Sequence, residues 1–173
     1  MNNQILEQAR GAYRAGDFVT AAQLFSAAKE SDKPCGEVDH LRGNALMRIG
    51  RYPDAAEAYF SALADTSYGK QGALFTNRGK ALAASGDLEG AAESFTHATQ
   101  DASYATPYKA YLGLGSALQK LGRTTEAGVA YRRGKPRSRR SACEPGRLLH
   151  RAQPSRGCRR GVSDRTRFCG SAR

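Results

Sequence analysis

The sequence predicts an all-α fold, an α-solenoid built from antiparallel helix-turn-helix repeats. Glycines recur at Gly16, Gly50, Gly86 and Gly122, in steps of 34, 36 and 36 residues, and a fixed period in the mid-thirties is typical of stacked repeat proteins. Each glycine also separates two apolar stripes at helical spacing. We therefore expect about three and a half repeats in one domain, residues 1–133, with repeats near 3–35, 37–69, 72–104 and 107–133.

The second repeat shows why each unit should be a helical hairpin. Leu41, Ala45 and Ile49 form one apolar stripe on a leading helix, which Gly50 can end because glycine adopts the left-handed conformation without a Cβ penalty. Pro53 suits the first turn of the trailing helix, where its missing N–H would have no partner. The turn between the two helices is short, so they must pack antiparallel. Over the whole chain, the pattern predicts helices at Asn3–Ala15, Phe18–Ser31, Glu37–Ile49, Pro53–Ala64, Gly72–Ala84, Leu88–Gln100, Pro107–Leu121 and Thr125–Arg133.

Small and aromatic residues recur in phase with this period. Gly43, Gly79 and Gly115 mark places where a leading helix must approach its neighbour closely. An aromatic ring recurs in the trailing helix, where the next repeat must be contacted, at Phe25, Tyr59, Phe95 and Tyr131. The two 36-residue steps also share an Asp-x-Ser-Tyr turn, at 65–68 and 101–104.

These residues resemble the tetratricopeptide repeat family. The leading helices carry the small residue of its Leu-Gly/Ala-x-x-Tyr motif, and the trailing helices carry its Ala-x-x-x-Phe/Tyr-x-x-Ala motif, over residues 3 to 133. The family's Trp is absent; Ile5, Asp39, Phe75 and Tyr111 occupy its place. The Asp-x-Ser-Tyr turns are a second departure. The resemblance implies a helical-repeat scaffold for protein binding, without catalysis.

In this architecture the leading helices line a concave groove, which suits an extended peptide or a segment of a partner protein. Amides could hold the peptide backbone, and the bases would attract acidic groups or a terminal carboxylate. Phasing on the small residues predicts these peptide-binding positions: Arg10, Tyr13, Arg14, Asn44, Met47, Arg48, Asn77, Lys80, Ser116, Gln119 and Lys120.

Charge divides the chain in two. Residues 1–133 hold 15 Lys or Arg and 14 Asp or Glu, whereas residues 134–173 hold 12 bases and 2 acids. No helical stripe or strand alternation continues after Gly134, so we expect residues 134–173 to be an Arg-rich, unstructured tail.

Three interpretations of the tail remain open. It could bind nucleic acid through phosphate contacts, although Phe168 is its only aromatic residue. It could be a solvated extension of high charge. It could also be a frame-shifted or truncated repeat, because a one-nucleotide shift allows codons that spell another repeat in outline. The chain would then be a fragment of a longer repeat protein with no independent activity.

No pattern in the chain indicates a catalytic, cofactor or metal site. The three histidines lie in separate elements, and the cysteines lack the paired spacing of zinc sites. No apolar run is long enough for a membrane span and the N-terminal residues do not resemble a signal peptide, so we expect a cytoplasmic protein. Because the last repeat lacks a cap, self-association through its exposed apolar face is also expected.

Overall fold

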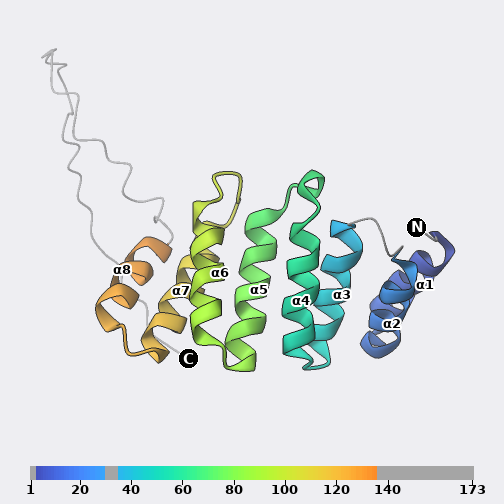
Figure 1. The fold of residues 1–173 in the computed structure, drawn as a ribbon, viewed down its shortest axis with the longest axis horizontal. Helices are drawn as coiled ribbons and strands as arrows, with labels where there is room; N and C mark the ends of the chain where they lie inside the picture. Colours follow the sequence, from blue (N-terminus) through green and yellow to red (C-terminus); the bar gives the residue numbers. More distant parts are fainter. Residues whose placement is uncertain (1–2, 30–34, 136–173) are drawn as a thin grey trace, which may run out of the picture. The chain divides into compact units, whose positions relative to one another are not determined.

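The computed structural model describes residues 3–29 and 35–135, and this part of the chain is a row of antiparallel helices (Figure 1). It contains eight α-helices, one short 3-10 helix and no strand, which confirms the predicted fold class. The elements are α1 (Asn3–Ala15), α2 (Phe18–Ala28), α3 (Gly36–Arg48), α4 (Tyr52–Leu63), η1 (Thr66–Tyr68), α5 (Gln71–Ser85), α6 (Leu88–Gln100), α7 (Pro107–Lys120) and α8 (Thr124–Gly134).

The four corners lie where the glycines predicted them. Gly16, Gly50, Gly86 and Gly122 have φ angles of 86°, 80°, 97° and 78°, the left-handed region that favours glycine. After two of these corners an aspartate caps the next helix. The carboxylate of Asp17 accepts a hydrogen bond from the Thr20 N–H, and that of Asp87 accepts one from Gly90.

One helix boundary was predicted wrongly. The sequence pattern extends the second helix to Ser31, whereas α2 ends at Ala28 and Lys29 is extended, with φ −78° and ψ 124°. Lys29 reaches out of the helix instead, and its Nζ lies 2.8 Å from Oδ2 of Asp39 on α3. The remaining helix ends lie within one residue of their predicted positions.

The small residues of the leading helices lie where two helices approach closely, and they make room for the rings of the trailing helices of their own repeats. A Cβ on Gly43 would lie 2.6 Å from the Tyr59 ring, one on Gly79 would lie 2.9 Å from Phe95, and one on Gly115 would lie 2.7 Å from Tyr131. Real Cβ atoms do not approach other atoms so closely, so each helix pair depends on its glycine.

The Asp-x-Ser-Tyr turns close each middle repeat onto its own leading helix. Oδ2 of Asp65 accepts a hydrogen bond of 2.9 Å from the Gly36 N–H, at the start of α3. In the next repeat, Oδ2 of Asp101 accepts one of 2.7 Å from Gly72, at the start of α5. These N–H groups have no partner within their helices. The extra residues of the 36-residue period therefore form a loop that caps a helix 29 residues earlier in the chain.

A buried acid occupies one of the positions where the family has Trp. Asp39 is fully buried, and it is held by Lys29 and, at 4.0 Å, by Arg42. A buried carboxylate is stable only when it is paired, so the ion pair to Lys29 joins the first repeat to the second.

Two further predictions concern the C-terminal tail and the absence of a membrane span. Residues 136–173 lie outside the described residues, so the predicted domain boundary and tail remain predictions. In the described residues, no helix has both the length and the apolar character needed to cross a bilayer.

Candidate functional site

The eleven predicted peptide-binding residues all lie on the leading helices α1, α3, α5 and α7, and none of them is buried. We call this set of eleven residues the leading-helix face. Arg14, Arg48, Lys80, Ser116, Gln119 and Lys120 are exposed, whereas Arg10, Tyr13, Asn44, Met47 and Asn77 are half-buried.

At the N-terminal end of this face, Arg10 is held between two acids. One guanidinium nitrogen lies 2.7 Å from Glu7 Oε1 and another lies 2.5 Å from Glu37 Oε1, on α3. The hydrogen bonds that Arg10 donates to Glu7 and Glu37 raise the pKa of Arg10. Its charge is therefore already neutralised, and it braces α1 against α3 instead of standing free for a ligand.

Three of the predicted residues share one cavity beside this ion pair. Arg10, Tyr13 and Arg14 line a space of about 430 Å³ with Glu7, Glu37, Leu41 and the ring of Phe25. Leu41 and Phe25 provide an apolar wall, and Tyr13 packs edge-on against Phe18 at 5.3 Å. The cavity thus offers an apolar surface with charged groups at its rim.

The middle of the face is a hydrogen-bonded cluster that joins the second and third repeats. The hydroxyl of Tyr59 donates to Asn44 Oδ1 at 2.8 Å. His40 Nδ1 lies 2.9 Å from the Tyr68 hydroxyl, and His40 Nε2 lies 3.2 Å from Asn77 Nδ2. Burial, with a smaller contribution from Lys70, lowers the pKa of His40. The neutral imidazole can therefore accept from Asn77 while it bonds Tyr68.

Four bases of the face make no ion pair with any described residue: Arg14, Arg48, Lys80 and Lys120. Arg14 donates only to the carbonyl of Arg10, at 3.3 Å, and the guanidinium of Arg48 lies 5.6 Å from the centre of the Phe18 ring. The two acids that line the cavity beside Arg14, Glu7 and Glu37, are both bound to Arg10. The face therefore has free positive charge.

Of the remaining predicted residues, Met47 and Gln119 contact other parts of the protein. Met47 packs against the core, and Gln119 Oε1 accepts from the Tyr131 hydroxyl at 3.0 Å. Sequence phasing missed Glu37, His40 and Tyr68 as parts of this site. The repeated Asp-x-Ser-Tyr turn was a sequence signal for Tyr68. Its hydrogen-bond partner His40 lies 28 residues earlier in the chain, so the contact between them could not be read from the sequence.

Leading and trailing helices differ in charge. The helices α1, α3, α5 and α7 hold eight Lys or Arg and three Asp or Glu, whereas α2, α4, α6 and α8 hold two and five. Positive charge thus collects on the helices that carry the candidate site, and negative charge collects on the other set.

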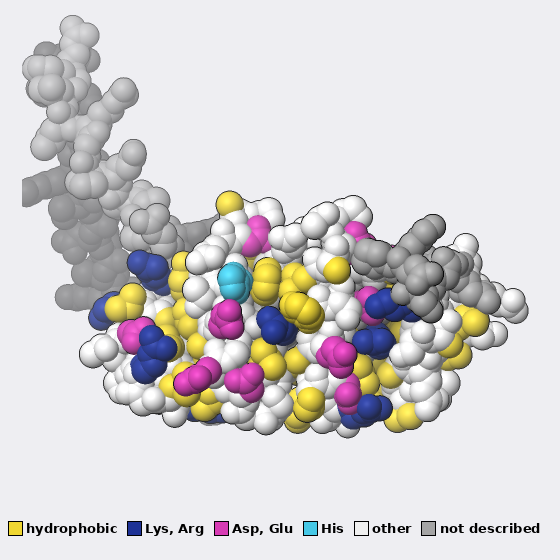
Figure 2. All heavy atoms as spheres, viewed as in Figure 1, with side chains coloured by type: hydrophobic (Ala, Val, Ile, Leu, Met, Phe, Trp, Pro, Cys, Tyr) yellow, Lys and Arg dark blue, Asp and Glu magenta, His cyan; other side chains and the backbone are white. Residues whose placement is uncertain are grey.

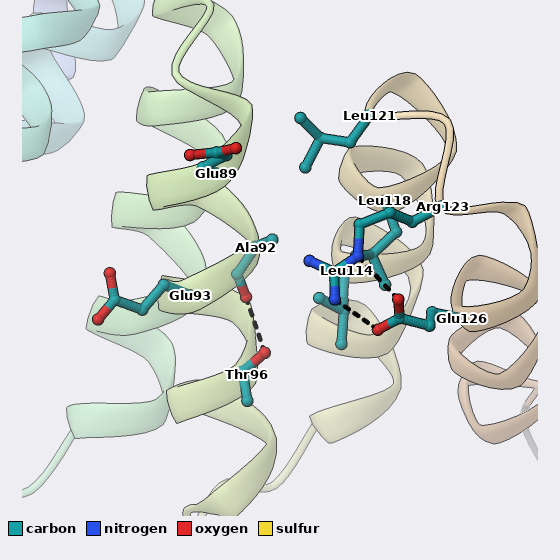
Figure 3. A pocket seen from close by; sticks show the side chains of 9 residues that line it. All are labelled: Glu89, Ala92, Glu93, Thr96, Leu114, Leu118, Leu121, Arg123 and Glu126. Atoms are coloured by element: carbon teal, nitrogen blue, oxygen red, sulfur yellow. Dashed lines mark hydrogen bonds and ion pairs between the residues drawn. The ribbon is translucent and has the colours of Figure 1, made fainter.

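A second cavity lies away from the leading-helix face. It measures about 490 Å³ and lies beside α6, α7 and the start of α8, lined by Glu89, Glu93 and Glu126 among others (Figure 3). Its one base, Arg123, makes a two-pronged contact with Glu126, at 2.8 and 2.7 Å. Neither here nor elsewhere in the described residues do three His, Cys, Asp or Glu side chains gather as a metal site would require.

Solved structures similar to this chain share its fold at low sequence identity. MamA matches with a TM-score of 0.67 and 19% identity, over 76% of this chain and 75% of MamA. PilW, a type IV pilus biogenesis factor, matches with 0.62 and 22%, over 76% of this chain and 60% of PilW. BtubC from P. vanneervenii matches with 0.62 and 18%, over 86% and 70%. No curated protein sequence matches. At these identities the likeness extends to the fold alone.

The family is established by a match to the sequence pattern itself. The model of the tetratricopeptide repeat matches residues 6–72 and 76–142, which together make up most of the chain. The matched segments contain the corner glycines, the small residues and the rings from which the resemblance was inferred. This chain belongs to the tetratricopeptide repeat family.

Proposed function

We propose that this protein is an interaction scaffold whose leading-helix face binds an extended, acidic segment of a partner protein. The family and the fold of the similar structures support a scaffold role. The observation that carries the acidic preference is the set of four bases, Arg14, Arg48, Lys80 and Lys120, without an ion pair among the described residues.

The positions of these bases suit a chain that crosses several repeats. Arg14, Arg48 and Lys120 occupy the same place in α1, α3 and α7, the last turn, while Ala84 leaves that place small in α5. Lys80 lies one turn earlier in α5. A partner with carboxylates at intervals would meet one base after another, and each charge-assisted hydrogen bond would add affinity.

The two asparagines can contact the backbone of such a segment. Asn44 uses its carbonyl oxygen to accept from Tyr59, which leaves its amino group free to donate to a peptide carbonyl. Asn77 has one amino hydrogen directed at His40. Its carbonyl oxygen has no hydrogen bond among the described residues and can accept from a peptide N–H.

Fluorescence anisotropy of the full chain with a labelled peptide that alternates Glu with Ala tests the proposal. Combining Arg48→Glu with Lys80→Glu should weaken binding at least about tenfold, or roughly 1.4 kcal/mol, because two attractions become repulsions. A peptide with Gln in place of Glu should bind the parent chain weakly.

The matched control is Arg132→Glu with Arg133→Glu, which makes the same charge change at exposed positions of α8. Affinity should stay near that of the parent. An equal loss in both double variants would show that overall charge, including the basic residues 134–173, governs binding, and the leading-helix face would be discarded.

The alternative function predicted from the sequence, nucleic-acid binding through residues 134–173, is distinguished by the same variants. A single-stranded oligonucleotide should bind with strong salt dependence if the alternative holds. Its affinity should not change in the Arg48→Glu, Lys80→Glu chain.

A further inference from the structure

A partly exposed strip of aromatic and basic side chains crosses three helices away from the leading-helix face, with two exposed and two half-buried members. Phe60 on α4 is 60% exposed, and the guanidinium of Arg78 on α5 lies 5.0 Å from the centre of its ring. Phe75, three residues before Arg78 on the same side of α5, stacks on His97 of α6 at 5.2 Å. Figure 2 shows hydrophobic side chains beside a basic one over α4 and α5. We call Phe60, Phe75, Arg78 and His97 the α4–α6 strip.

The fold does not require a ring at position 60. Ser26, Phe60 and Thr96 each lie ten residues after a corner glycine, so they are equivalent in the first three repeats. Ser26 Oγ donates to the Ala22 carbonyl and Thr96 Oγ1 donates to that of Ala92. Both hydroxyl groups therefore bond back to their own helix, whereas Phe60 places a large apolar ring in water at the same place. Such a patch on a folded surface indicates contact with another molecule.

The charge of the strip restricts what that molecule can be. The guanidinium carbon of Arg78 lies over the Phe60 ring, and Arg78 has no ion pair among the described residues, so its N–H groups can still donate to a carboxylate. The two trailing helices packed against α5, α4 and α6, carry acids and no Lys or Arg. Asp54 and Glu57 lie on α4, and Glu89 and Glu93 lie on α6, with Glu93 3.9 Å from His97. A polyanion such as nucleic acid would be repelled, whereas one carboxylate next to an apolar group would fit.

We propose that the α4–α6 strip is a second docking surface, which takes a short peptide with an aromatic or branched aliphatic side chain close to a single carboxylate. The apolar side chain packs on Phe60 and Phe75, and the carboxylate bonds the free edge of Arg78. This surface is independent of the leading-helix face, so the protein can bind two partners at once.

Selection of phage-displayed random heptapeptides against the full chain tests this assignment. The recovered peptides should pair an aromatic or branched aliphatic residue with Asp or Glu within two positions. As synthetic peptides they should bind the Phe60→Thr and Arg78→Gln chains at least about tenfold more weakly. Arg48→Glu with Lys80→Glu should leave their affinity unchanged, which separates this surface from the leading-helix face.

Phe60→Thr copies the residue of the equivalent position in α6, so its unfolding midpoint in urea should match that of the parent chain. Arg78→Gln provides a second variant that keeps Phe60 in place. The proposal is overturned if the selected peptides bind both variants as tightly as the parent. It is also overturned if they lack an acid, or if a single-stranded oligonucleotide competes with them at this strip.

Discussion

The rings of the first three repeats and the ring of the fourth are equivalent in sequence but differ in burial. Phe25, Tyr59 and Phe95 are 0%, 1% and 2% exposed, whereas Tyr131 is only half-buried. Phe95 lies between two leading helices and packs against a glycine of each. A Cβ added to Gly79 of α5 would lie 2.9 Å from its ring, and one added to Gly113 of α7 would lie 2.5 Å away. Tyr131 has Gly115 of α7 on one side, and no described helix follows α8.

This difference shows that a repeat does not bury its own interior. Each ring is half enclosed by its own leading helix and then covered by the next one, so stability is shared between neighbours. At the fourth repeat a cavity of about 230 Å³ remains, lined by Tyr111, Leu114 and Val129 among others, and Val129 is 42% exposed.

The largest expected effect compares the two kinds of ring directly. Phe95→Ala should lower the free energy of unfolding by about 3–5 kcal/mol, because it empties a fully enclosed site. Tyr131→Ala should cost roughly half as much, because part of that ring already contacts water. Urea unfolding followed by circular dichroism measures both.

An equal cost for the two variants would mean that something covers Tyr131. The self-association predicted from the sequence would be one cause, and it can be recognised by its dependence on protein concentration. Sedimentation at rising concentration should then show dimers of the parent chain, which replacing Val129 by Glu should disperse.

A smaller effect compares glycines of an internal and of the terminal repeat. Gly79→Ala should cost about 1–3 kcal/mol, because the added Cβ meets the Phe95 ring at 2.9 Å. Gly128→Ala, in α8, has no atom within 4 Å of the added Cβ and should stabilise by about 0.5–1 kcal/mol, since alanine loses less entropy in a helix. Opposite shifts in the urea midpoint are expected; shifts of the same sign would contradict the close packing of the internal repeat.

The smallest effect concerns the acid-dependent caps that Asp65 and Asp101 form in the middle repeats. Hydrogen bonds from Ser67 and Gly36 lower the pKa of Asp65 from its ordinary 3.8, and those from Ser103 and Gly72 lower that of Asp101. The folded form therefore holds these protons less tightly than the unfolded form. Their stabilisation is present above about pH 4 and is lost as the pH falls through the lowered pKa values.

Replacing both Asp65 and Asp101 by Asn should flatten the loss of stability below pH 4, because the amide does not titrate but its oxygen still accepts from the helix N–H. Urea midpoints measured from pH 2.5 to pH 6 provide the comparison. If the double variant loses stability as steeply as the parent, other carboxylates dominate acid unfolding. The N-cap residue of α7, Thr106, makes no side-chain hydrogen bond to the helix. The first turn of α7 should therefore be as stable at low pH as at neutral pH.

The parts of the fold that were predictable are those controlled by residues close together in the chain. A corner glycine acts through its own φ angle, and an apolar stripe acts through neighbours three or four residues away. The candidate site was predictable only as a set of positions. Phasing placed Arg10 and Arg48 on the leading-helix face, but only the contacts of Arg10 show that Glu7 and Glu37 neutralise it while Arg48 stays unpaired.

The amino-acid sequence by itself determined the period, the corners and the positions of the rings and of the small residues, because each is a local choice repeated in phase. Only the tertiary structure decided that Asp65 caps α3, that Lys29 leaves its helix to pair with buried Asp39, and that Tyr131 is half-buried while the other three rings are fully buried. Each of these depends on groups many residues apart, or on the presence of a neighbour. A polar group's energy depends on what surrounds it once the helices have stacked.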